Sequence, residues 1–133
     1  MRVNLKLHHV GYTVADIRVS AKRFALLGYQ VGEVLYDEGL NVELCYLTKE
    51  EGTVIELVRQ LQSDSLEAEL LRAGGVMPYH LGYEADAFDE ACHELDAQGY
   101  RRLFHPVPVG VLGGKRICYF HHPDIGYVEL LEK

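Results

Sequence analysis

Apolar and polar residues alternate in several short stretches of this chain, and other stretches carry apolar residues at the spacing of a helix. Residues 5–14 are predicted to form a first strand, which alternates from His9 onward, so His9 and Val10 face opposite sides. Apolar residues recur at helical spacing from Ile17 to Phe24, which predicts a helix after that strand. Three more strands are then expected, at residues 31–36, 42–47 and 54–58. The first part of the chain therefore has the order β-α-β-β-β.

The same order is expected again in the second part of the chain. Phe88, Cys92 and Leu95 form the apolar stripe of its predicted helix. Its strands are expected at residues 79–85, 102–104, 116–120 and 127–131. Between the two parts, residues 60–78 are interpreted as a linker with a short helix capped by Ser63-Asp64.

The two parts also repeat one another in sequence. A shift of 71 positions aligns residues 9–29 with residues 80–100 and gives 5 identities in 21 positions. A shift of 73 positions aligns residues 43–57 with residues 116–130. The matching residues are His9 and His80, Gly11 and Gly82, Tyr12 and Tyr83, Gly28-Tyr29 and Gly99-Tyr100, Cys45-Tyr46 and Cys118-Tyr119, and Glu56-Leu57 and Glu129-Leu130. The chain is therefore interpreted as one module written twice.

Length and composition limit the class of protein. The 133 residues fit one domain, residues 1–133, in which modules at residues 5–59 and 79–132 flank the linker. The net charge of −7 argues against a nucleic-acid partner, because a phosphate backbone needs clustered Lys and Arg. No apolar run approaches the roughly 20 residues that span a bilayer, and the N-terminus lacks the apolar core of a signal peptide. We therefore expect a cytoplasmic protein with neither a nucleic-acid nor a membrane partner.

Four polar residues fall on predicted strands at matching positions of the two modules. His9 and His80 lie on the first strand of each module, and Glu56 and Glu129 lie on the last. Each Glu has apolar neighbours that should point into the core, so the His and Glu side chains share the other face. A buried carboxylate is costly unless it is paired or bound to a metal. We therefore expect these four side chains to hold one divalent metal ion, for which Zn, Ni, Co, Fe or Mn suits the donors better than Ca.

The other histidines and the cysteines are interpreted as structural. His8 faces the opposite side of the first strand and has Tyr79 as its repeat partner, so it is not expected to be a ligand. Surface or structural roles are expected for His93, His105, His121 and His122. An odd number of cysteines without a Cys-x-x-Cys pair predicts buried free thiols at Cys45, Cys92 and Cys118.

At this level of detail the sequence resembles a known family. The repeated βαβββ order, the histidines that open each module and the closings Val-Ile-Glu56-Leu and Tyr-Val-Glu129-Leu resemble the vicinal oxygen chelate superfamily. That superfamily includes glyoxalase I, methylmalonyl-CoA epimerase, extradiol dioxygenases and the fosfomycin and bleomycin resistance proteins. The resemblance implies an α+β fold in which two βαβββ modules form a curved mixed sheet around a metal site, the glyoxalase fold. Since many relatives are dimers, it also implies a homodimer.

The resemblance implies a metal-dependent isomerase, epimerase or lyase. Such an enzyme removes a proton next to a carbonyl, through an enediolate or enolate, from a small substrate with two neighbouring oxygens. The order of the expected ligands, His9, Glu56, His80 and Glu129, is like that of bacterial glyoxalase I. The epimerase usually has Gln at the position of Glu56, which counts against an epimerase. The segment Gly114–Pro123 instead resembles the epimerase, and Glu43 matches a Glu that bacterial epimerases use as a base. Glu129 is the first candidate base, Glu43 the second, and Arg116, the repeat partner of Glu43, is a candidate for binding an anionic substrate group.

Three alternatives come from other functional classes. An Fe(II) ring-cleaving dioxygenase of this superfamily typically uses two His and one Glu and often has four modules, which four candidate ligands in two modules disfavour. Metal-free binding proteins of the bleomycin resistance type lack the two His and two Glu ligands, so the presence of these residues here argues against that alternative. Fosfomycin modification requires a three-ligand site and a basic pocket, and the sequence identifies neither. The choice between the glyoxalase and epimerase activities stays open at this stage.

Overall fold

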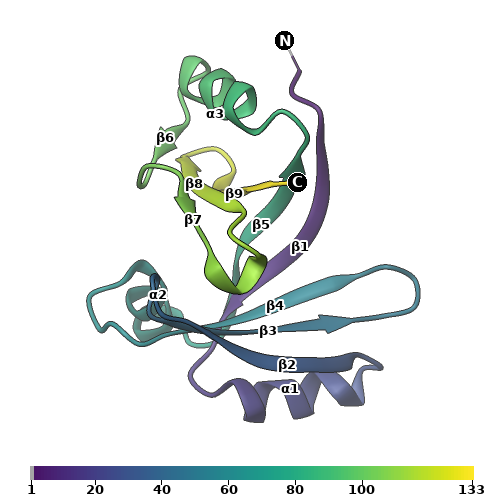
Figure 1. Cartoon of the computed structure of the whole chain (residues 1–133). Helices are drawn as coiled ribbons and strands as arrows, with labels where there is room; N and C mark the ends of the chain where they lie inside the picture. Colours follow the sequence, from purple (N-terminus) through teal and green to yellow (C-terminus); the bar gives the residue numbers. More distant parts are fainter. Residues whose placement is uncertain (1) are drawn as a thin grey trace. The chain divides into compact units, whose positions relative to one another are not determined.

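The computed structural model describes residues 2–133 and has a mixed α+β architecture (Figure 1). These residues form nine strands and three α-helices. The first five elements have the order βαβββ, and α2 follows them, before the remaining strands and α3. The strands form a mixed sheet in the order β2-β3-β4-β1-β5-β9-β8-β6, with β7 beside β8. The predicted α+β fold class is therefore confirmed. The elements are β1 (Leu5–Thr13), α1 (Ile17–Leu26), β2 (Gln30–Asp37), β3 (Val42–Thr48), β4 (Val54–Gln60), α2 (Leu66–Gly74), β5 (Met77–Ala85), α3 (Phe88–Ala97), β6 (Arg101–Arg102), β7 (Val107–Pro108), the short 3-10 helix Gly110–Leu112, β8 (Arg116–His122) and β9 (Gly126–Glu132).

The chain divides into two compact units. One unit comprises residues 9–79, and the other comprises the segment up to His8 together with residues 80–133. The boundary falls inside β1, so the first residues of this strand belong with the C-terminal part of the chain. The predicted modules at residues 5–59 and 79–132 stay an interpretation of the sequence.

In the unit of residues 9–79, α1 covers one face of the strands β2, β3 and β4 (Figure 1). The strand β4 pairs parallel with β1 and antiparallel with β3, and β3 pairs antiparallel with β2. Since side chains alternate along a strand, every second residue faces α1. The core on that face consists of Val14, Ile17, Ala21, Cys45, Leu47, Ile55 and Leu57.

The helix α1 begins and ends where the sequence predicts. The Oδ1 atom of Asp16 accepts hydrogen bonds from the backbone N–H groups of Arg18 at 3.0 Å and Val19 at 3.1 Å. These bonds satisfy two of the donors that a helix start leaves without an intrahelical partner. Gly28 has a φ of 98°, a left-handed conformation that only glycine adopts at little cost, and the chain turns there into β2.

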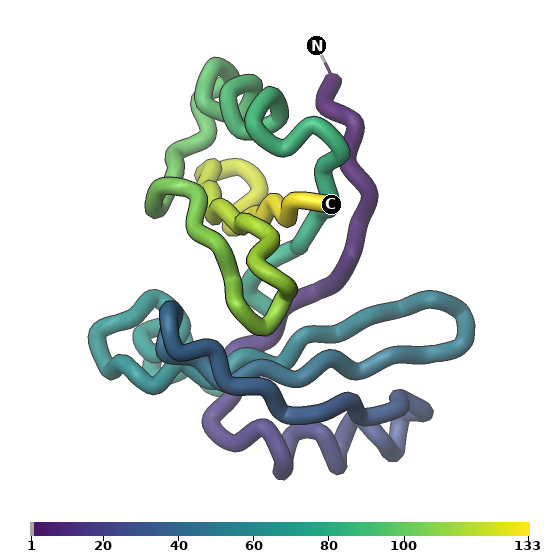
Figure 2. Tube along the Cα trace, viewed as in Figure 1, coloured from purple at the N-terminus to yellow at the C-terminus, as the bar shows by residue number. Residues whose placement is uncertain are grey.

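In the unit that contains residues 80–133, α3 packs against β9 and β6. The strand β5 pairs parallel with β9, and β9 pairs antiparallel with β8. The chain trace shows the N-terminal segment running beside β5 (Figure 2). The core beneath α3 consists of Ala85, Phe88, Ala91, Cys92, Leu95, Cys118, Phe120, Val128 and Leu130. This unit therefore repeats the local plan of the other one, in which a helix covers one face of a short stretch of sheet.

Two sequence predictions need correction. The helix in the linker is capped by Ser65, whose hydroxyl accepts a hydrogen bond from Ala68 N–H at 3.1 Å, and not by Ser63-Asp64. The predicted strand at residues 102–104 shrinks to the two residues of β6, because only Arg101 and Arg102 keep a strand register with β8. Both errors are shifts of one or two residues at the ends of short elements, where boundaries are least sharply defined.

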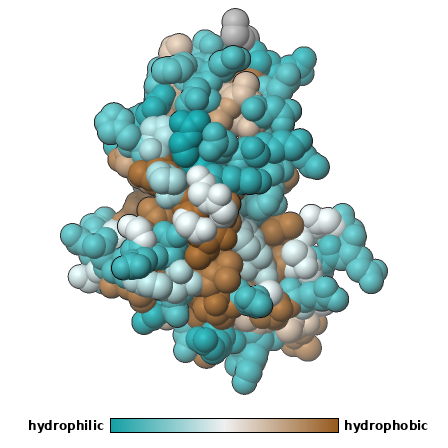
Figure 3. Space-filling model, in the orientation of Figure 1, coloured by the Kyte–Doolittle hydropathy of each residue, from teal (hydrophilic) through white to brown (hydrophobic). Residues whose placement is uncertain are grey.

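The cysteines are buried, whereas several hydrophobic side chains are exposed on the surface. Cys45, Cys92 and Cys118 are buried and free, as predicted, and burial raises the pKa of the Cys45 thiol. The visible face carries hydrophobic residues among hydrophilic ones (Figure 3), and Leu26 and Leu27 at the end of α1 are exposed. None of the helices in residues 2–133 is long and apolar enough to span a membrane.

Candidate metal centre

His9 and Glu56 meet on the face of β1 and β4 that points away from α1. The parallel register places Gly11 opposite Glu56, and His9, two residues before Gly11, faces the same side. His9 Nε2 lies 3.2 Å from Glu56 Oε1. Only 1% of His9 and 6% of Glu56 is exposed. His9 and Glu56 therefore form a buried polar pair on the face of the sheet that points away from α1.

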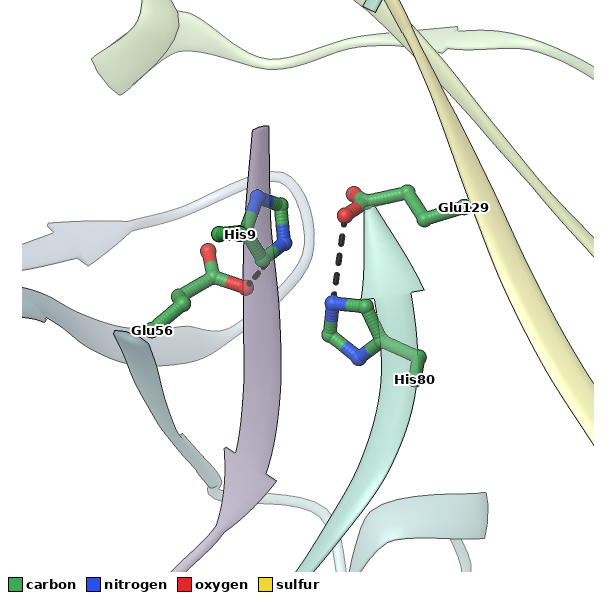
Figure 4. Close-up of side chains that lie close together, drawn as sticks. All are labelled: His9, Glu56, His80 and Glu129. Atoms are coloured by element: carbon green, nitrogen blue, oxygen red, sulfur yellow. Dashed lines mark ion pairs between the residues drawn. The ribbon is translucent and has the colours of Figure 1, made fainter. Parts of the chain in front are cut away.

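His80 and Glu129 form the matching pair in the other unit. The register of β5 and β9 places Gly82 opposite Glu129, so His80 faces the same side as that carboxylate. His80 Nε2 lies 3.2 Å from Glu129 Oε1, and both residues are buried. Figure 4 shows each His–Glu pair with its ion pair as a dashed line. In both pairs, therefore, the His Nε2 atom contacts the Glu Oε1 atom at the same distance.

The four side chains have the donor chemistry of a transition-metal site. Within residues 2–133, they are the one group of three or more His, Cys, Asp or Glu residues that could hold a metal ion, and their ligand atoms lie within 4.8 Å of one another. Two imidazole nitrogens and two carboxylate oxygens suit Zn, Ni, Co, Fe or Mn. Two buried carboxylates are costly unless cations compensate them, and a bound divalent ion would do so. The donor set therefore fits a metal, and its role as the ligand set stays a prediction.

Two tyrosines on the same faces were missed by the sequence analysis. Tyr46 lies directly across from Glu56 on β3, and Tyr119 lies directly across from Glu129 on β8. The ring of Tyr46 meets the ring of His9 edge-on, with the centroids 5.9 Å apart. The hydroxyl of Tyr119 lies 3.4 Å from His80 Nδ1. The signal was present in the repeated pairs Cys45-Tyr46 and Cys118-Tyr119, which served as evidence for the repeat and not for the site.

The structure does not bring Glu43 to these four residues. Glu43 has the same parity along β3 as Cys45, which belongs to the core under α1, so it faces away from Glu56. Its Oε1 atom accepts a hydrogen bond from Arg59 Nη1 at 2.9 Å. The expectation that Glu43 is a second base at this site is therefore not supported by its position.

Arg116 also lies on the helix side of its strand, as Cys118 does. Its guanidinium stacks 4.9 Å from the ring centroid of Phe88. It bonds Asp89 at 3.1 Å and Glu132 at 2.9 Å, and these carboxylates raise the pKa of Arg116, Glu132 contributing most. Arg116 is therefore already committed to two carboxylates, which argues against its predicted role in binding an anionic substrate.

The repeat relates the positions of Glu43 and Arg116 to one another. The shift of 73 positions relates Glu43 to Arg116 and also relates Arg59 to Glu132. Each unit therefore has one ion pair at the same place, between its last two long strands, with the charges exchanged. Such a pair ties neighbouring strands together, which is a structural role.

Replacing Arg116 with Gln is expected to lower the free energy of unfolding at pH 7 and leave metal binding unchanged. The hydrogen bonds from Arg116 lower the pKa of Asp89 and of Glu132 below their ordinary values of 3.8 and 4.5. Lowered carboxyl pKa values give stability that is present above those ordinary values and lost as the pH falls through the folded-state values. The unfolding free energies of the two proteins, measured in urea, should therefore differ at pH 7 and converge as the pH falls below the folded-state pKa values of Asp89 and Glu132. A difference that persists in acid would mean that Arg116 stabilises mainly through its contact with Phe88.

The sequence and the structure were compared with known protein families and solved structures. A family model described as the Glyoxalase/Bleomycin resistance protein/Dioxygenase superfamily matches residues 8–119. The methylmalonyl-CoA epimerase of Mycobacterium tuberculosis is 25% identical, with a TM-score of 0.80 over 95% of this chain and 86% of that one. The Streptomyces coelicolor methylmalonyl-CoA epimerase, in complex with 2-nitronate-propionyl-CoA, is 21% identical, with a TM-score of 0.81 over 98% and 99% of the two chains.

A hypothetical protein from Bacillus halodurans C-125 is 23% identical, with a TM-score of 0.78 over 98% of this chain and 95% of that one. A comparison with curated protein sequences gives no significant match. The family model covers most of the chain, and the solved structures share its fold along nearly the whole length. The chain belongs to the Glyoxalase/Bleomycin resistance protein/Dioxygenase superfamily.

Proposed function

We propose that this protein is a metal-dependent isomerase that moves a proton on the carbon next to a carbonyl, and that it acts as an epimerase on an acyl-CoA. One observation carries the proposal: two buried His–Glu pairs, one in each unit, share the donor chemistry and the spacing that a single divalent ion requires. The similarity to methylmalonyl-CoA epimerases supports the reaction class and a CoA-linked substrate.

In this proposal His9, Glu56, His80 and Glu129 hold the ion. A bound divalent cation would supply Lewis-acid stabilisation for two neighbouring oxygens of the substrate. Glu129 is the base, because its carboxylate is buried beside His80 and its neighbours Val128 and Leu130 belong to the core. A carboxylate held at a fixed position in a site that excludes water is well suited to proton transfer.

A second candidate function is the isomerisation of a hemithioacetal, as in glyoxalase I. The residue that favours it is Glu56, because the resemblance gives glyoxalase I a Glu at this position and the epimerase a Gln. Two carboxylates in place of one would leave the site with a divalent ion formally neutral, whereas a Gln would leave one positive charge. Substrate preference is therefore the property that separates the two activities.

Metal analysis of the purified protein, followed by isotope exchange, tests the proposal. We expect about one divalent ion per chain and metal-dependent incorporation of deuterium from heavy water next to the carbonyl of methylmalonyl-CoA. The same assay with a hemithioacetal of glutathione tests the second candidate. A protein that binds no divalent ion, or that binds one and exchanges neither substrate, would contradict the proposal. We further propose that the protein is cytoplasmic and that it is a homodimer; sedimentation at several concentrations checks the homodimer.

A further inference from the structure

Each of the two His–Glu pairs has a tyrosine beside its histidine. Tyr119 brings its hydroxyl to 3.4 Å from His80 Nδ1, in a buried hydrogen bond. The repeat-related Tyr46 meets His9 through its ring edge. The pair His80–Glu129 therefore has a polar partner on the far nitrogen of its histidine, and this partner comes from the neighbouring strand β8.

Tyr119 is held in place by its surroundings. Its Cα lies opposite Glu129 in the register of β8 and β9, and only 8% of the residue is exposed. Its ring packs against Phe104 with the centroids 5.6 Å apart and against the ring of His80 at 5.1 Å. A phenol packed on two sides has little freedom to turn its hydroxyl elsewhere.

The hydroxyl suits His80 in two protonation patterns. A neutral imidazole carries one proton, on either Nδ1 or Nε2. When Nε2 carries the proton it can donate to Glu129 Oε1, 3.2 Å away, and Nδ1 then accepts from the Tyr119 O–H. A metal ligand must offer a lone pair, so an Nε2 ligand requires the proton on Nδ1. The oxygen of Tyr119 can accept that hydrogen bond without moving, since a hydroxyl both donates and accepts.

We propose that Tyr119 is a positioning residue for His80. It orients the imidazole so that Nε2 faces the ligand group, and it satisfies Nδ1 in both tautomers. The inference rests on the proposed metal site and goes beyond it by naming a residue outside the ligand set. Partners on the outer nitrogen of a metal-bound histidine fix its tautomer and typically account for roughly 10–100-fold in metal affinity.

The test compares Tyr119→Phe with Tyr36→Phe in zinc titrations against a chromophoric chelator. Tyr36 is exposed and its hydroxyl bonds Asn41 at 3.0 Å, so this control loses the same atom and the same kind of bond away from the site. We expect Tyr119→Phe to weaken zinc binding by roughly 10–100-fold and Tyr36→Phe to leave it unchanged. Urea unfolding of the metal-free proteins shows whether Tyr119→Phe remains folded.

Nitrogen-15 NMR of the imidazole rings gives a readout that a purely structural role would not change. In the zinc-loaded native protein we expect the His80 proton on Nδ1, with a ring N–H resonance that exchanges slowly with water. In Tyr119→Phe we expect that proton to exchange faster. Zinc bound to the native protein through His80 Nδ1, or an unchanged affinity in Tyr119→Phe, would overturn the inference and leave the metal site standing. A native protein that binds no zinc, cobalt or nickel would overturn both.

Discussion

The Glu129→Gln protein is expected to exchange the proton next to the substrate carbonyl at least about a hundredfold more slowly than the native protein. General bases contribute roughly 10²–10⁴-fold to proton transfer, and an amide cannot accept the proton. Glutamine keeps the size of the side chain and an oxygen that can still reach a cation. The loss should therefore appear mainly in kcat for deuterium exchange, while zinc affinity falls much less.

The matched control is the same substitution at Glu43. This residue lies on the opposite face of its strand from Glu56 and is paired with Arg59, so Glu43→Gln should stay within a few-fold of the native rate. If Glu43→Gln proves as slow as expected for Glu129→Gln, and Glu129→Gln remains active, the base has been assigned to the wrong carboxylate. Both variants should unfold at urea concentrations close to that of the native protein.

Much of the fold could be predicted because its signals are local and occur twice. The alternating segments gave the long strands, and Asp16 and Gly28 marked the start and end of α1. The repeat was the stronger signal for the site. A single buried His or Glu has many explanations, but matching pairs on matching strands predict one group of side chains, and these four residues form a group that could hold a metal ion.

The roles expected for Glu43 and Arg116 did not take into account the alternation of side chains that predicted the strands. Glu43 lies two residues before Cys45, and Arg116 lies two residues before Cys118. Both cysteines belong to the cores under the helices, so the residues two positions away face the same side. The cross-strand partners Arg59 and Glu132 depend on hairpin register, which turn length sets and apolar pattern alone does not.

Replacing His9 with Ala is expected to weaken zinc binding by more than about a hundredfold, which exceeds the usual cost of losing an outer hydrogen-bond partner. His9 is nearly fully buried and offers Nε2 beside Glu56, so its loss removes one proposed ligand and leaves that carboxylate without its imidazole. Zinc titration against a chromophoric chelator measures the change. Urea unfolding of the metal-free protein checks that His9→Ala still folds, and His9→Gln provides a larger, polar replacement.

The neighbouring histidine provides the control that the strand itself offers. His8 is adjacent to His9 in β1, so its side chain points to the opposite face of the sheet. Changing His8 to Ala removes the same ring from the same strand and should leave zinc affinity within a few-fold of native. If His8→Ala loses zinc and His9→Ala keeps it, the ligand face of β1 has been assigned incorrectly. If neither variant loses zinc, β1 supplies no ligand, and the proposal that one ion joins the two His–Glu pairs fails.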